Sequence, residues 1–68
     1  MNKVKIGDKI KIVGSSKIHH HLAVPSVAEI IEIDPNDFKV SGHDSRGVML
    51  EQWVSIIDTA PIRKAVIK

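Results

Sequence analysis

Three consecutive histidines, His19-His20-His21, are the residues of this chain with the clearest capacity for chemistry. Neutral imidazoles bind zinc, nickel or copper without a thiolate, and the chain contains no cysteine. His43 can add a further ligand if its turn lies nearby. Consecutive residues in an extended backbone point alternately to opposite sides, however, so three neighbours seldom reach one metal. We therefore expect a polar loop without metal or other cofactor, with a pH-sensitive contact as an alternative use of the imidazoles.

Two further groups have the residue types of catalytic sites. The segment His43-Asp44-Ser45 contains base, acid and nucleophile, but a triad is assembled by the fold and not by adjacent turn residues. Asp44 and Ser45 are better explained as turn-forming residues. Glu29 and Glu32 are expected on opposite faces of a strand, which does not suit paired acid–base work. We therefore expect no enzyme, although an active site formed between subunits remains a weaker alternative.

The net charge of +2 conceals an uneven distribution. Residues 1–28 contain five lysines against one acid, residues 29–58 contain seven acids against two bases, and the last ten residues add three bases. The first basic stretch forms an alternating row that could follow a phosphate backbone. This row is Lys3, Lys5, Lys9 and Lys11. Stacking platforms for bases are scarce, because Phe38 and Trp53 are the only aromatic residues besides histidine. A solvated outer strand face is therefore the preferred interpretation, and nucleic-acid binding is the alternative.

The elements that must position these residues are strands. The segment KVKIGDKIKIV alternates, which places Val4, Ile6, Ile10 and Ile12 on one face, with a bend at Gly7-Asp8 before the strand 9–13. Residues 14–26 form a long loop, in which Leu22 is an expected anchor. Simple alternation in the next strand, 27–33, puts Glu29 and Ile33 on one face and Glu32 on the other.

Turn chemistry separates the remaining strands. Turns are predicted at 34–37 and 43–47, with strands at 38–41 and 48–54 between and after them. Residues 55–58 suit a single 3₁₀ turn into a short fifth strand. Short strands at this spacing, built mainly from isoleucine and valine, predict a small sandwich or barrel. We expect one domain at 1–60 and a basic-apolar tail at 61–68.

The order of these elements resembles the Src-homology-3-type (SH3-like) barrels of bacteria and their phages, including modules with the Kyrpides–Ouzounis–Woese motif. The resemblance runs from Val4 to Asp58 and is carried by Gly7-Asp8, Val27 and Trp53-Val54. It implies an all-β fold, a five-stranded SH3-like barrel with a long first loop. The glycine that such motifs place before the second long strand is absent, and Pro25-Ser26 stands there. This departure weakens the nucleic-acid function that those modules imply.

Binding of another protein is the function that these features favour. A lone tryptophan is a good interface anchor, and Trp53 is expected to share a face with the long loop and the 43–47 turn. The predicted partner-binding residues are Trp53, His20, His21, Leu22, His43 and Arg46. No apolar run approaches the ~20 residues of a membrane span, and no signal peptide is evident, so we expect a cytoplasmic protein. The oligomeric state stays open.

Overall fold

The computed structural model describes residues 4–62, which form an antiparallel sheet of five strands. The elements are β1 (Lys9–Ile12), β2 (Ser26–Ile33), β3 (Asp37–His43), β4 (Met49–Ser55), the 3₁₀ helix η1 (Ile56–Asp58) and β5 (Thr59–Pro61). The expected all-β class, five strands and 3₁₀ turn are confirmed. No helix within residues 4–62 has the length and apolar character needed to cross a membrane. The predicted tail beyond Ile62 and the residue Lys3 lie outside the described residues.

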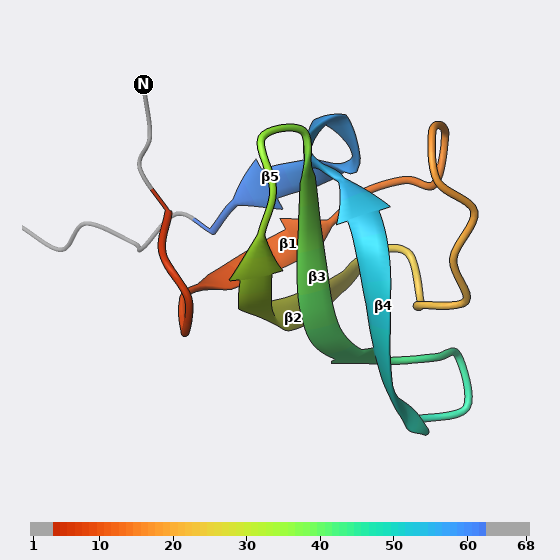
Figure 1. Ribbon diagram of the computed structural model, residues 1–68. Coiled ribbons are helices and arrows are strands. Elements are labelled where there is room, and N and C mark those ends of the chain that lie inside the picture. Colours follow the sequence, from red (N-terminus) through yellow and green to blue (C-terminus); the bar gives the residue numbers. More distant parts are fainter. Residues whose placement is uncertain (1–3, 63–68) are drawn as a thin grey trace, which may run out of the picture.

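The sheet is open. Its strand order is β4-β3-β2-β1-β5, so β4 and β5 are the two outer strands, and no pairing between them occurs within residues 4–62. The sheet twists strongly, and β1 and β5 run across the direction of β3 and β4 (Figure 1). Closure of the predicted barrel is therefore not seen among the described strands, although the five antiparallel strands are.

Alternation in β1 is confirmed for the strand but fails before it. Ile10 and Ile12 are buried and the intervening lysines are exposed. Ile6 was expected on the buried face, yet 64% of it is exposed. The reason is a turn: the Asp8 N–H donates to the Lys5 carbonyl at 3.0 Å, and Gly7 has a positive φ of 99°. This turn ends the alternation, so Ile6 points to solvent.

A β-bulge in β2 corrects a second expectation. Glu29 pairs with Ser41 and Ile30 with Val40, but the next paired residue is Glu32, opposite Lys39. Ile31 is thus an extra residue, and it shifts the alternation of every residue that follows. Glu29 and Glu32, expected on opposite faces, consequently lie on the same outer face of the sheet. Ile33 changes sides as well and pairs with the buried Phe38.

The core lies on the inner face of the curved sheet. It consists of Ile10, Ile12, Leu22, Ala28, Ile30, Phe38, Val40 and Val54. Leu22 is the contribution of the long loop, as expected from the sequence. It fits because Gly42 has no side chain: a Cβ there would lie 3.1 Å from Leu22 Cδ2 and 3.0 Å from Ala28 Cβ. Burial of a leucine side chain contributes about 1.5–3 kcal/mol, so Leu22 fastens the loop to the sheet.

Asp58 of η1 fastens the beginning of the same loop. Its carboxylate accepts hydrogen bonds from the Ser16 hydroxyl at 2.7 Å, the Ser16 N–H at 3.0 Å and the Lys17 N–H at 3.3 Å. The Asp58 carbonyl accepts from the Val13 N–H at 2.8 Å. The hydrogen bond from the Ser16 hydroxyl, followed by those from the two backbone N–H groups, lowers the pKa of Asp58 below its ordinary value, against an opposing effect of burial. Both ends of the long loop are therefore held in place.

Candidate functional site

The long loop does meet the β3–β4 hairpin, as the sequence analysis proposed. The Ala23 N–H donates to the His43 carbonyl at 2.9 Å, and the His21 N–H donates to Gln52 Oε1 at 2.6 Å. These contacts bring His21 and Arg46 to one shallow hollow of about 400 Å³. The hollow is lined by His21, Asp44, Ser45, Arg46, Leu50 and Gln52. Two of the predicted contact residues thus lie together.

Two others are buried. His20 is 6% exposed and Leu22 is 5% exposed. His20 Nδ1 accepts from the Leu22 N–H at 3.2 Å, so Nε2 carries the proton and donates to the Gly14 carbonyl at 2.7 Å. The sequence placed both residues among the partner contacts. Their burial assigns them to the packing of the loop instead.

Two of the three consecutive histidines contact each other, the third points away from them, and the three rings do not converge on a common metal position. The rings of His19 and His21 meet edge to face, with centroids 5.3 Å apart and planes at 84°. His20 points the other way, into the protein, as alternation in an extended segment requires. Among residues 4–62, no three histidine, aspartate or glutamate side chains come together in a way that could hold a metal ion.

Trp53 lies apart from the loop. On β4, Leu50, Gln52 and Val54 face the loop and core, so the alternate residue Trp53 faces outward, paired in register with Lys39. His43, paired with Met49, has the same outward orientation, and its Nδ1 lies 2.9 Å from the Asp44 carbonyl oxygen. The expected single face of loop, turn and tryptophan is therefore divided between the two sides of β4.

The described lysines of the predicted basic row are exposed but not continuous. Lys9 and Lys11 alternate with buried isoleucines on β1, whereas Lys5 precedes the Gly7 turn. Lys9 is paired in register with Glu29 of β2. Basic and acidic segments are thus neighbours across strands, which agrees with the solvated-face interpretation of this row.

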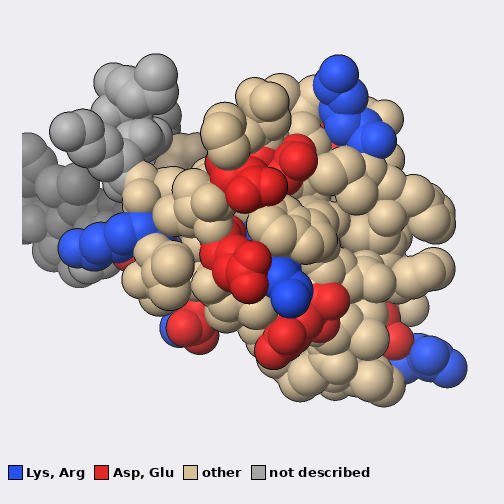
Figure 2. Space-filling view, viewed as in Figure 1, with Lys and Arg blue, Asp and Glu red and all other residues tan. Residues whose placement is uncertain are grey.

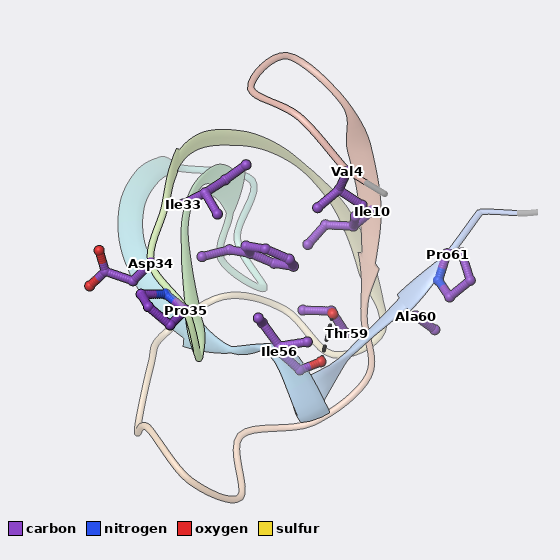
Figure 3. A pocket seen from close by; sticks show the side chains of 10 residues that line it. Val4, Ile10, Ile33, Asp34, Pro35, Ile56, Thr59, Ala60 and Pro61 are labelled. Atoms are coloured by element: carbon purple, nitrogen blue, oxygen red, sulfur yellow. Dashed lines mark hydrogen bonds between the residues drawn. The ribbon is translucent and has the colours of Figure 1, made fainter. Parts of the chain in front are cut away.

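An apolar groove that was not predicted from the sequence lies at one end of the sheet. It has a volume of about 570 Å³ and lies between the β2–β3 turn and the η1–β5 segment. Its lining residues are Val4, Ile10, Ile33, Asp34, Pro35, Phe38, Ile56, Thr59, Ala60 and Pro61. Figure 3 shows Ile33, Ile56 and Val4 directed toward a common space, while the Asp34 carboxylate points away from it. Because these residues come from segments far apart in the sequence, no local sequence pattern predicts the groove.

Several polar groups around the groove are hydrogen-bonded within the chain. The Thr59 hydroxyl donates to the Ile56 carbonyl at 2.7 Å, and the Ile56 N–H donates to the Asn36 carbonyl at 3.1 Å. The Asp34 N–H donates to the Asp37 carbonyl at 2.8 Å. The bond between Ile56 and Asn36 also ties η1 to the β2–β3 turn and so links the two walls of the groove. What remains open to a ligand is an apolar surface.

The surface that the groove offers to a ligand is mainly apolar. Among the described residues that line it, Asp34 is the only ionisable one, and the Thr59 hydroxyl is already engaged. A second hollow continues past Pro35 and Ile56, where Ile57 is 65% exposed. Exposed apolar residues in one area are typical of interaction surfaces.

Comparisons of the chain with protein-family models, curated proteins and solved structures found no match.

Proposed function

We propose that this chain is a non-catalytic protein-interaction module of SH3-like fold, and that the apolar groove holds an apolar segment of a partner protein. The observation that carries the proposal is the groove itself, with nine uncharged lining residues beside Asp34. The strand order, in which a 3₁₀ turn leads β5 back to pair with β1, supports the SH3-like part of the proposal.

An apolar segment of another protein suits the groove better than a polar metabolite does. A volume of 570 Å³ accommodates two or three side chains, and the walls offer few free hydrogen-bonding groups to orient a polar molecule. The rim carries the negative charge of Asp34. A lysine or arginine next to the apolar residues of the partner would complement this charge.

Nucleic-acid binding is the alternative function, and it would use a different surface. Within residues 4–62, no lysine or arginine lines the groove, whereas Lys5, Lys9 and Lys11 are exposed around β1. Phosphate contacts at those lysines would make the affinity fall steeply with added salt. Apolar contacts in the groove would be far less sensitive to salt.

The test is a selection of displayed random peptides on the immobilised full chain, followed by affinity measurements on the selected peptides. The informative variant is Ile33→Lys, because Ile33 lines the groove and is already 42% exposed. The matched control is Val27→Lys, on the same strand, 46% exposed and outside the groove lining. Loss of one buried isoleucine contact, about 1.5–3 kcal/mol, corresponds to roughly tenfold or more in affinity.

We expect enriched peptides that contain apolar residues, bind Ile33→Lys at least about tenfold more weakly, and bind Val27→Lys like the unmodified chain. Selection of peptides that bind all three proteins equally would place the site elsewhere and overturn the groove proposal. In a parallel measurement with a single-stranded oligonucleotide, tight binding that depends on Lys9 and Lys11 would replace the groove proposal with the alternative function.

A further inference from the structure

The outer face of the sheet holds the one tryptophan of the chain, and the apolar groove does not use it. Trp53 of β4 is half-buried and lies in register with Lys39 of β3, which in turn lies opposite Glu32 of β2. The neighbouring row contains Glu29, Ser41 and Glu51 in the same three strands. We call these six residues the outer face. Tryptophan at the surface offers a large contact area with a single polar group.

The outer face is acidic on balance. It holds three carboxylates, those of Glu29, Glu32 and Glu51, and one ammonium group, that of Lys39. Lys9 of β1 lies at its border, in register with Glu29. The bulge at Ile31 is responsible for the acidic balance, because it brings Glu29 and Glu32 to the same side. Within residues 4–62, none of these carboxylates is engaged in an ion pair. Figure 2 shows acidic side chains grouped over the middle of this side of the molecule, with a basic side chain among them.

We propose that the outer face binds a lysine- or arginine-rich segment of a partner protein, with Trp53 as its apolar contact and the three glutamates as its charged contacts. A cation placed near the tryptophan ring gains from the electrons of the ring as well as from Glu51, two residues away on the same strand face. Phosphate groups would be repelled, so this surface is not the one for a nucleic acid.

Lys39 gives the proposal a feature that a nonspecific acidic surface would lack. It lies between Glu32 and Trp53 in the register and so occupies the place where a cation of the partner would sit. Its removal should therefore strengthen the binding of a basic segment. A chain without Lys39 is thus expected to bind a basic segment more tightly than the unmodified chain does.

The experiment uses a capped peptide in which lysine alternates with serine, and the matched glutamate–serine peptide. Because Trp53 is the only tryptophan, its fluorescence reports directly on the outer face. We expect the lysine peptide to change the Trp53 emission and the glutamate peptide to leave it unchanged. Added salt should weaken the binding, because the charged contacts are exposed.

Single-residue variants distinguish binding at the outer face from an effect of the net charge of the protein. Glu32→Gln and Glu51→Gln should each weaken the lysine peptide about two- to fivefold, as expected for exposed ion pairs. Lys39→Met should strengthen it, and Trp53→Ser, measured by calorimetry, should weaken it more than either glutamine variant. The matched control is Asp34→Asn, which removes an acid at the rim of the groove and should change nothing.

An unchanged Trp53 emission would overturn the proposal. An equal loss of affinity in Asp34→Asn and Glu51→Gln would do so too, because it would reduce the effect to net charge. The groove variant Ile33→Lys serves as the last control: it should bind the lysine peptide as the unmodified chain does. Failure of the groove proposal would therefore leave the outer-face result intact, and the reverse holds as well.

Discussion

Two aspartates, Asp58 and Asp44, do the same chemical work in two regions and differ in the distance along the chain that they span. Each is buried, at 4% and 8% exposure, and each accepts two backbone N–H groups and one side-chain donor. Asp44 bonds to Arg46 and Val48, only two and four positions away. Asp58 bonds to Ser16, 42 positions away. Asp44 closes a local turn, and Asp58 joins η1 to the beginning of the long loop.

The sequence distance between the hydrogen-bonded residues determines which other parts of the fold each region requires. The Asp44 turn can form within the β3–β4 hairpin, because all of its partners are local. The Asp58 contacts exist only when β5 has returned to β1 and the long loop has begun its course over the sheet. The groove wall at Ile56 lies in the same 3₁₀ helix as Asp58. The Asp58 contacts therefore support the proposed binding site, whereas those of Asp44 support the hollow at the other end.

The largest expected effect is that of Asp58→Ala. It leaves the hydroxyl of Ser16 and two backbone N–H groups without their acceptor, so the loop should detach and the melting temperature should fall more than for any other variant discussed here. Tryptic cleavage after Lys17 should accelerate strongly. In Asp44→Ala, by contrast, cleavage after Arg46 should accelerate and cleavage after Lys17 should not. Acceleration of both cleavages in both variants would show that the two regions unfold as one.

Acid should affect both regions in the same direction. The backbone hydrogen bond from Val48, followed by those from Arg46, lowers the pKa of Asp44, and the Ser16 and Lys17 donors lower that of Asp58. The folded state thus binds fewer protons than the unfolded state, in which both groups titrate at about 3.9. The stability from these groups is complete above that pH and is lost as the pH falls toward the lowered folded pKa. Urea unfolding at a series of pH values measures this loss.

The comparison of variants tests the assignment of this acid sensitivity. Asp58→Asn and Asp44→Asn should each flatten the fall in the free energy of unfolding at low pH, because neither amide titrates. Asp34→Asn is the control, since its side chain accepts none of the hydrogen bonds described above. A slope that stays the same in all three variants would assign the acid sensitivity to other carboxylates.

Ser16→Ala should have an intermediate effect. It removes the shortest of the three hydrogen bonds to Asp58, at 2.7 Å, and keeps both backbone N–H donors. The loss in the free energy of unfolding should therefore be measurable but clearly smaller than that of Asp58→Ala. Denaturant titration against the neighbouring control Ser15→Ala gives the value. A loss as large as that of Asp58→Ala would mean that the backbone donors contribute little.

The smallest effect is expected for Arg46→Ala. The Arg46 side chain is 81% exposed, and its ion pair with Asp44 spans 3.3 Å. Such exposed pairs contribute little to stability, and the Arg46 N–H that bonds to Asp44 remains in the variant. The melting temperature should therefore stay within about a degree of the unmodified chain. A larger drop would show that the pair, and not the backbone turn, holds the hairpin end.

Local patterns were sufficient where the structure is local. Alternation predicted β1, and turn chemistry predicted both the 43–47 turn and the 3₁₀ turn before β5. Alternation failed at Ile6 and again at Glu32, because one turn and one bulged residue each reset it. The bend at Gly7-Asp8 was predicted, but its effect on the side to which Ile6 points was not. Ile31 could not be recognised as a bulge without the partner strand, which sets the register.

For the candidate binding surfaces too, local features could be predicted from the sequence and features that depend on tertiary structure could not. The contact of the long loop with the β3–β4 hairpin was expected, but Trp53 was grouped with it wrongly, since the face of a residue on β4 depends on its parity relative to Leu50 and Gln52. The groove was missed altogether. Its walls are contributed by Val4, by β1, by the β2–β3 turn and by the η1–β5 segment. Only the tertiary arrangement places those apolar residues around one space.

The missing side chain at Gly42 has a consequence for related sequences. Because a Cβ at this position would meet Leu22 and Ala28 at about 3 Å, the three positions share one fixed volume. Substitutions there should be correlated: a homologue with a larger residue at 42 should carry a smaller one at 22 or 28, or a loop that takes another course. The length of the loop between positions 15 and 19 carries no such constraint from this volume. Sequence divergence should therefore accumulate in the loop outside Ser16 and Leu22, while positions 22, 28 and 42 change only together.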